Sequence, residues 1–336
     1  MALLGWGAAA ATTTHPAPAS SKSGQVVQHA SILSQPRIPT TGSYLGVDPE
    51  FATGDDGALG SGPNTTLAQL NILEGQIGRA VGIVSFYISW DQEPPIIGMQ
   101  QVTAEGSIPM VSWHCGPADT AITAGQYDGL IRQDAEAYKA FGRPMFLRWF
   151  WEMNLVTNGN HPTCFSNQTD PTVIGPQYVA AYQHIYNIFQ QVGATNVAFI
   201  WCPSAALNNP VSPADFYPGS SDVQWVGFDM YDRVSSISYA NAMTKGKTVT
   251  YSSLLAYGKP LIQTETGAPN SGLGVGQPTQ QQWLQQAGAS IPTQFPAVKG
   301  LVYVDASDSA GNYILEGSGL TQFAALGRTP FFTSMP

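Results

Sequence analysis

Eight short apolar runs alternate with polar segments of helical periodicity through most of the 336-residue sequence. Runs of this kind are typical of parallel strands that are buried on both faces. They lie at residues 44–48, 80–90, 108–114, 144–152, 197–203, 225–231, 260–267 and 298–306. The alternation predicts a parallel sheet whose strands are connected by helices.

The segments between the runs show where several helices begin and end. Helical spacing is clearest at residues 124–142 and 175–193, and each of these segments closes with a glycine, which suits a helix C-terminus. Another helix is expected near Pro278. The structural alternative, an open doubly wound sheet, would carry a glycine-rich phosphate loop after an early strand, and none is visible. Eight such units match an α/β fold with a single (β/α)8 TIM barrel, which we place at residues 44–336.

Residues 1–43 are rich in Ala, Thr, Ser and Pro, and we expect a disordered leader there. Its short apolar start resembles the remnant of a secretion signal, although the basic first residues of such a signal are missing. No segment has the roughly 18 to 20 consecutive apolar residues that a membrane span needs. We therefore expect no membrane partner.

The charge balance excludes some classes of partner. The net charge is -9 and the pI is near 4.8, so no basic face is expected that could bind nucleic acid or an anionic membrane. Charged residues make up only 10% of the chain, which leaves a polar, uncharged surface of the kind common in secreted proteins. We expect a secreted, extracellular monomer with an uncharged partner.

The chain has three cysteines, which allow one disulfide and leave one thiol. Cys115 and Cys164 follow the third and fourth predicted strands, so a disulfide between them is compatible with the barrel. Cys202 is expected to be a buried free thiol. No Cys-x-x-Cys pair is present, and we expect neither a metal site nor a cofactor.

In a (β/α)8 barrel the active site lies at the C-terminal ends of the strands. Carboxylates, amides and aromatic rings gather there, and these groups suit sugars, because an indole stacks on a pyranose face while polar groups bind hydroxyls. The candidate residues at these ends are Asp48, Trp90, Trp113, His114, Glu152, Asn154, Trp201, Asp229, Tyr231, Glu265, Tyr303 and Asp305.

Two of these carboxylates follow strongly apolar strands, Glu152 on the fourth and Glu265 on the seventh. Glycoside hydrolysis with retention needs such a pair, about 5 to 5.5 Å apart, with one acid protonated and the other ionised. Aromatic neighbours should keep Glu152 protonated. Arg148 is expected on the same side as Glu152 by strand alternation, and Tyr231 is expected to donate a hydrogen bond to Glu265.

The remaining candidates have structural alternatives. His114 is either a substrate ligand or a lining residue. The tryptophans are either sugar platforms or packing at the barrel rim, and we expect one or two of the three to touch sugar. The aspartates either bind hydroxyls or cap the turns that follow.

Three segments carry a family resemblance. The stretches RWFWEMN, FYPGSSDVQWVGFDMYD and KPLIQTETGAP, in this order and spacing, resemble glycoside hydrolase family 26. This clan A family of retaining barrels is known for β-mannanases and for some β-glucanases and β-xylanases. The likeness extends from about Tyr44 to Leu326 and is most specific from Tyr217 to Tyr231. It implies that Glu152 is the acid/base, that Glu265 is the nucleophile and that Tyr231 contacts the nucleophile; Arg148 also matches a family arginine.

The chain departs from the family's mannanases at several positions that shape the sugar subsites. Trp151 stands where they usually have a histidine, and Tyr303 stands where a tryptophan is frequent. Their tryptophan-rich stretch after the acid/base is replaced here by LVTNGNHPTC. The resemblance therefore supports the catalytic pair more strongly than it supports mannan as the substrate.

Together these features predict a retaining, endo-acting glycoside hydrolase of β-linked polysaccharide, of β-mannan type by resemblance, that works by double displacement. The alternatives are a β-glucanase, β-xylanase or exopolysaccharide hydrolase of the same clan, or a non-catalytic carbohydrate-binding barrel.

Overall fold

The computed structural model describes residues 34–49, 66–156, 163–206, 211–233, 237–270, 278–308, 311–333 and 335. Most of the predicted leader therefore lies outside the described residues. Its last part, residues 34–43, contacts the rest of the described chain. The Gln35 side-chain amide donates to the Val197 carbonyl at 3.0 Å, and the Ser43 backbone amide donates to the Phe331 carbonyl at 2.7 Å. The packed chain thus begins ahead of Tyr44.

The eight predicted strands close into a parallel barrel in chain order, and the predicted (β/α)8 fold is confirmed. Strand β1 completes the closure by pairing with β8 from Tyr44–Gly300 to Pro49–Asp305. The barrel strands are β1 (Tyr44–Pro49), β2 (Ile83–Ile88), β3 (Ile108–Trp113), β4 (Met145–Trp149), β5 (Val197–Trp201), β6 (Trp225–Asp229), β7 (Leu261–Thr266) and β8 (Val298–Asp305). A short antiparallel pair, β9 (Ser307–Asp308) and β10 (Gly311–Asn312), follows β8.

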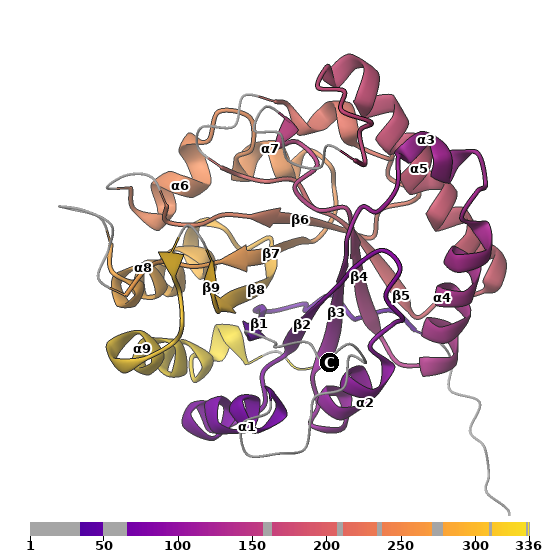
Figure 1. The fold of residues 1–336 in the computed structure, drawn as a ribbon. Coiled ribbons are helices and arrows are strands. Elements are labelled where there is room, and N and C mark those ends of the chain that lie inside the picture. Colours follow the sequence, from indigo (N-terminus) through magenta and orange to yellow (C-terminus); the bar gives the residue numbers. More distant parts are fainter. Residues whose placement is uncertain are drawn as a thin grey trace, which may run out of the picture. The chain divides into compact units, whose positions relative to one another are not determined.

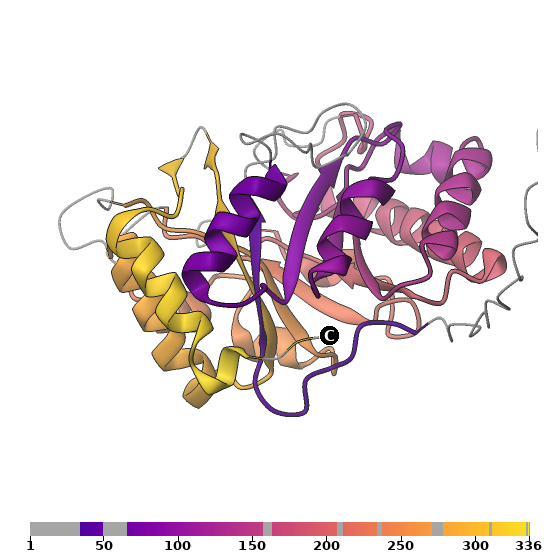
Figure 2. The ribbon, with the colours of Figure 1, turned by 90° about the horizontal axis from the view of Figure 1, so that it is seen from below.

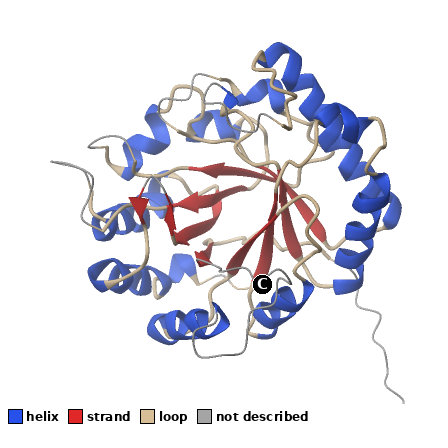
Figure 3. Ribbon diagram, viewed as in Figure 1, coloured by secondary structure: helices blue, strands red, loops and turns tan. Residues whose placement is uncertain are grey.

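Helices surround the strands (Figures 1 and 3). They are α1 (Thr66–Ile77), α2 (Ile96–Ala104), α3 (Asp119–Thr123), α4 (Asp128–Phe141), α5 (Pro171–Val192), α6 (Tyr239–Lys245), α7 (Tyr251–Leu255), α8 (Gln280–Gln294) and α9 (Gly317–Gly327), with 3-10 turns η2 (Pro213–Phe216) and η3 (Pro330–Phe332). Figure 2 shows α8 and α9 side by side on the outside of the barrel. Among the described residues, no helix has the length and apolarity that crossing a membrane requires.

The two helices that the sequence marked most clearly end as predicted. Gly142 follows α4 and Gly193 follows α5, and both residues have a positive φ, 69° and 79°. A positive φ is strained for residues with a Cβ, so glycine suits this position. At the other end of α5, the Asp170 side chain accepts a hydrogen bond from the Thr172 amide and caps the helix.

Side chains alternate along each strand between two cores. The inner core fills the lower barrel and includes Phe146, whose ring lies edge-on to Trp225 with centroids 5.2 Å apart. The outer core lies between strands and helices and includes Trp149, which stacks on Tyr178 of α5. In β4 this alternation places Phe146 and Arg148 inside the barrel, and Leu147 and Trp149 outside it.

The end of β4 differs from the prediction. The sequence run continues to Glu152, but the strand ends at Trp149, and Phe150 and Glu152 adopt positive φ angles of 46° and 55°. Such angles cost non-glycine residues about 1 to 2 kcal/mol each. The backbone amide of Glu152 donates to the Cys202 carbonyl at 2.8 Å, which fixes this turn against the end of β5.

Candidate active site

Arg148 lies at the centre of the barrel mouth and is fully buried. Its guanidinium binds both oxygens of Asp229 at 3.0 and 2.9 Å and Oε1 of Glu265 at 2.6 Å. It also donates to the Ser112 hydroxyl and to the Tyr87 hydroxyl. One arginine therefore places a positive charge beside two buried carboxylates.

Glu265 is held by three donors. Tyr87 and Arg148 bind its Oε1, each at 2.6 Å, and Tyr231 binds its Oε2 at 2.6 Å, as the sequence predicted for Tyr231. Burial raises the pKa of Glu265, but the positive charge of Arg148 and the hydrogen bonds from Tyr231, Tyr87 and Arg148 outweigh it. The pKa of Glu265 is therefore lowered, and the carboxylate is ionised at neutral pH.

Glu152 is half-buried and has the opposite environment. Burial, followed by the negative charge of Glu265, raises its pKa to about 7, while a hydrogen bond with Ser204 and the charges of Arg233 and Arg148 lower it. The negative charge of Glu265 acts on Glu152, so the two predicted carboxylates lie near enough to interact. Two carboxylates with divergent pKa values are the arrangement expected of an acid and a nucleophile.

Asp48 and Asp229 complete the acidic lining. Asp229 accepts a hydrogen bond from the Thr264 hydroxyl at 2.5 Å in addition to its pair with Arg148. Asp48 lies near Tyr87 and Glu265; burial and the charge of Glu265 raise its pKa. Burial and the neighbouring negative charge therefore favour the neutral form of the Asp48 carboxyl.

Tyr87 is a site residue that the sequence analysis missed. It lies within an apolar run, yet Ser85 and Tyr87 occupy alternate positions in β2 while Phe86 and Ile88 lie in the outer core. Side chains alternate along a strand, so Ser85 and Tyr87 share the inward face of β2. Two polar side chains at alternate positions of an apolar run were the signal that could have revealed Tyr87.

Trp151 packs over the arginine. Its ring centroid lies 5.0 Å from the Arg148 guanidinium carbon, and its ring meets Tyr87 and His114 edge-on at 5.3 and 5.9 Å. A cation over an indole face is stabilised by the ring quadrupole. The tryptophan that departs from the family pattern thus lies in the site itself.

The structure corrects four predicted sugar-binding residues. Trp90, Trp113, Trp201 and Tyr303 are buried in the outer core, where they face helices or loops. Trp113 stacks on Trp90 with centroids 4.6 Å apart, Trp201 lies edge-on to Tyr217 and Tyr257, and the Tyr303 hydroxyl binds the Tyr313 carbonyl. These rings stabilise the fold and present no face to a substrate.

Asn154 is also a structural residue. Its amide nitrogen donates to the Ser204 carbonyl at 3.0 Å, and its amide oxygen accepts from the Ser204 backbone amide at 2.8 Å. This pair joins the turn after β4 to the segment after β5. The predicted role of Asn154 in substrate binding is therefore corrected to positioning of the segment that contains Glu152.

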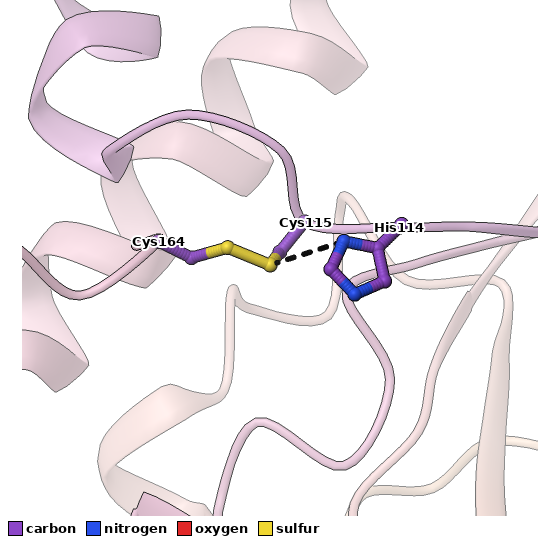
Figure 4. A group of neighbouring side chains, drawn as sticks. All are labelled: His114, Cys115 and Cys164. Carbon is purple, nitrogen blue, oxygen red and sulfur yellow. Dashed lines mark hydrogen bonds between the residues drawn. A yellow bond between two sulfur atoms is a disulfide. The ribbon is translucent and has the colours of Figure 1, made fainter. Parts of the chain in front are cut away.

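His114 and the disulfide lie together beside the site (Figure 4). Cys115 and Cys164 form a disulfide, as the barrel geometry allowed, and Cys202 is a buried free thiol as predicted. The imidazole of His114 is exposed, and its Nδ1 lies 3.6 Å from Cys115 Sγ. His114 and the two cysteines lie close enough to hold a metal ion together, but only if both cysteines are thiolates, and here both sulfurs form the disulfide.

No protein-family model matches the chain. It is 27% identical over 235 residues to endoglucanase H of Acetivibrio thermocellus, a match that covers 67% of this chain and 25% of that protein. It is 24% identical over 203 residues to a β-1,3-xylanase of a Vibrio species, covering 55% and 40% of the two chains. The matches therefore span less than half the length of either relative.

Solved structures agree with the fold. A modular endo-β-1,4-mannanase of Cellulomonas fimi, a glycoside hydrolase family 26 mannanase, aligns with a TM-score of 0.58 at 18% identity, covering 86% of this chain and 71% of that one. At this level of identity the likeness shows the barrel fold. The chain is thus similar in sequence to an endoglucanase and a β-1,3-xylanase, and similar in fold to a glycoside hydrolase family 26 mannanase.

Proposed function

We propose that the protein is a retaining glycoside hydrolase that cleaves β-linked polysaccharide, with Glu265 as nucleophile and Glu152 as acid/base. The observation that carries the proposal is the pair of neighbouring carboxylates with opposite pKa shifts. Glu265 has a lowered pKa because three donors bind it, and Glu152 has a pKa raised to about 7 by burial and by Glu265 itself.

In the first step, a Glu265 oxygen attacks the anomeric carbon while the bond to the leaving sugar breaks and Glu152 gives its proton to the departing oxygen. The glycosyl ester on Glu265 carries no negative charge. The contribution of that charge to the raised pKa of Glu152 then disappears, so Glu152 becomes more acidic and ionises. In the second step Glu152 takes a proton from water while the water oxygen attacks the anomeric carbon and the bond to Glu265 breaks. This releases the sugar with retained configuration and restores the Glu265 carboxylate and the protonated Glu152.

We propose a β-mannan-type polymer and endo attack, on the strength of the family resemblance. The similar proteins are an endoglucanase, a β-1,3-xylanase and an endo-β-1,4-mannanase. β-Linked polymers of glucose and of xylose are therefore candidate substrates beside mannan. We also propose that the protein acts as a secreted monomer. The Cys115–Cys164 disulfide supports secretion, since disulfides form and persist in oxidising compartments.

The test compares the wild type with Glu265→Ala and Glu152→Ala on mannan, glucomannan, mixed-linkage β-glucan, β-1,4-xylan, β-1,3-xylan and a bacterial exopolysaccharide. Release of reducing ends should fall roughly a thousandfold or more in Glu265→Ala. Glu136→Ala, an exposed glutamate on α4, is the matched control and should keep wild-type activity. Glu265→Ala with wild-type activity would refute the assignment, and a wild type that binds polymers without cleaving them would favour the carbohydrate-binding alternative.

Azide separates the roles of the two glutamates. With an activated aryl glycoside, Glu152→Ala should still form the glycosyl-enzyme, because a good leaving group needs no proton, and azide should then give a β-glycosyl azide. Glu265→Ala should instead give the α-glycosyl azide. The product configurations, read by NMR, would be exchanged if the two roles were assigned the wrong way round.

A further inference from the structure

Arg233 lies after β6, two residues beyond Tyr231, and neither the sequence motifs nor the reaction steps above use it. We propose that Arg233 is a positioning residue of the active site, which fixes the Tyr231 phenol on Glu265 and supplies positive charge at Glu152. The proposal rests on the proposed function, because it assigns Arg233 a role toward the two carboxylates named there.

The first support is the contact between Arg233 and Tyr231. The guanidinium carbon of Arg233 lies 3.8 Å from the centroid of the Tyr231 ring, which is within the range of a close cation–π contact. The hydroxyl of the same ring donates to Glu265 Oε2 at 2.6 Å. Arg233 therefore packs against the ring whose orientation determines one of the three hydrogen bonds to the nucleophile.

The second support is that Arg233 is itself held in place by Tyr313. Its Nε donates to the Tyr313 hydroxyl at 2.9 Å, and its guanidinium carbon lies 5.5 Å from the Tyr313 ring centroid. Tyr313 is fully buried, and its carbonyl accepts hydrogen bonds from Gln280 and Tyr303. The segment after β10 thereby anchors a side chain that projects from the end of β6.

The third support is the close packing beneath this stack. A Cβ added to Gly267, directly after β7, would lie 3.0 Å from the Tyr313 ring and 3.1 Å from the Tyr231 ring. The two rings are 5.3 Å apart between centroids. Glycine at this position lets the rings approach each other, so the segments after β6, β7 and β8 meet where Arg233 is bound.

Arg233 also acts on the other carboxylate. The negative charge of Glu265 raises the pKa of Glu152, and the positive charges of Arg233 and Arg148 lower it; Asp229 also interacts with Glu152. Arg148 is already committed to Asp229 and Glu265. Removing the charge of Arg233 should therefore raise the pKa of Glu152 further and leave Glu265 with a less firmly oriented tyrosine.

The experiment measures kcat, KM and the pH dependence of kcat/KM for Arg233→Met, Arg233→Lys and Tyr313→Phe. In Arg233→Met the alkaline limb should move to higher pH by roughly 0.5 to 1 unit, because Glu152 loses a positive neighbour. Its kcat should fall roughly 10- to 100-fold, because the reacting groups are misaligned. Its KM should change little, because the contacts that bind the polymer remain. Arg132→Met, an exposed arginine on α4, is the control and should change neither quantity.

The other two variants separate charge from geometry. Arg233→Lys keeps the charge, so its alkaline limb should stay near the wild-type position while kcat remains reduced. Tyr313→Phe loses the hydrogen bond to Arg233 Nε and should lower kcat without a large pH shift. If Arg233→Met leaves both the alkaline limb of the pH profile and kcat unchanged, the proposal is overturned. If the alkaline limb shifts in Arg233→Met and returns to its wild-type position in Arg233→Lys, the proposal is supported.

A second readout does not depend on turnover. The pKa of Glu152, followed by NMR in protein carrying ¹³C-labelled glutamate, should be higher in Arg233→Met than in the wild type, with Arg132→Met unchanged. An equal pKa would overturn the proposal even if the enzyme is active, in which case the proposed function still stands. If the wild type cleaves no polymer, the proposed function fails while this titration still tests whether Arg233 acts on Glu152.

Discussion

At the scale of single residues, the hydrogen bond from Tyr87 to Glu265 shows how the two carboxylates come to differ. Tyr87, Tyr231 and Arg148 all donate to Glu265, whereas among the described residues Ser204 forms a hydrogen bond with Glu152. Burial raises the pKa of both carboxyls, and the charge of Arg148 together with these hydrogen bonds reverses that effect at Glu265.

This leads to a prediction for Tyr87→Phe. Loss of one donor should raise the pKa of Glu265, so the acidic limb of the pH profile should move to higher pH while the alkaline limb from Glu152 stays near 7. The lowered pKa of Glu265 also contributes stability above its unfolded pKa, which is lost as pH falls through the folded value, and Tyr87→Phe should reduce that contribution. Tyr186→Phe, which loses a hydroxyl remote from the site, is the control. Identical acidic limbs in the wild type and Tyr87→Phe would refute this account.

At the scale of elements, the end of β4 and the disulfide shape the mouth. The sequence predicted the fourth strand and its terminal carboxylate, but it extended the strand to Glu152, whereas the strand ends at Trp149. The positive φ angles of Phe150 and Glu152 could not be predicted, because neither residue type favours that region. They follow from tertiary contacts, including the hydrogen bond from the Glu152 amide to the Cys202 carbonyl.

The disulfide gives a prediction for the loops after β3 and β4. Cys115 and Cys164 are 49 residues apart, and the double variant Cys115→Ala/Cys164→Ala should lose about 2 to 4 kcal/mol of unfolding free energy, because its unfolded chain is less constrained. It should also lose activity, because His114 and the Trp151 ring that it meets lie beside the freed loops. Urea unfolding with and without dithiothreitol measures the first effect. Dithiothreitol should lower the stability of the wild type to that of the double variant and leave the variant unchanged. Equal stability of the two proteins without dithiothreitol would contradict the expectation.

At the scale of the whole molecule, the sequence was sufficient for the barrel and for the carboxylate pair, but it did not reveal which way each strand faces. Runs that are apolar on both faces hide the phase of alternation. Trp113 and Tyr303 were therefore predicted at the mouth and lie outside the barrel, while Tyr87 was overlooked and lies inside it. Arg148 indicates which side chains of its strand face the interior, because an arginine within an apolar strand must lie where carboxylates can pair with it.

The pH dependence of stability is also a property of the whole molecule. Asp134 on α4 is 4% exposed, and burial together with the charge of Glu93 raises its pKa to about 7. Because the folded pKa lies above the unfolded value of 3.8, the folded state binds the proton more tightly, and this group loses its contribution to stability as pH rises from about 4 to about 7.

Asp134→Asn should therefore be more stable than the wild type at pH 8 and similar to it at pH 4, with a difference of at most about 4 kcal/mol. Thermal unfolding at both pH values measures it, with the exposed Glu136→Gln on the same helix as control. A variant that is less stable than the wild type at pH 8 would show that the Asp134 carboxylate is stabilised in the folded protein.

Arg148 also couples local unfolding of the barrel to the site at its mouth. From β4 it contacts side chains of β2, β3, β6 and β7, so its bonds cross the interior as well as following the sheet. Neither half of the barrel can separate from the other without leaving a buried charge unpaired. The backbone amides of β4 and β7 should therefore exchange with deuterium as one cooperative unit, and a molecule bound at Glu265 should slow exchange on the opposite side of the barrel.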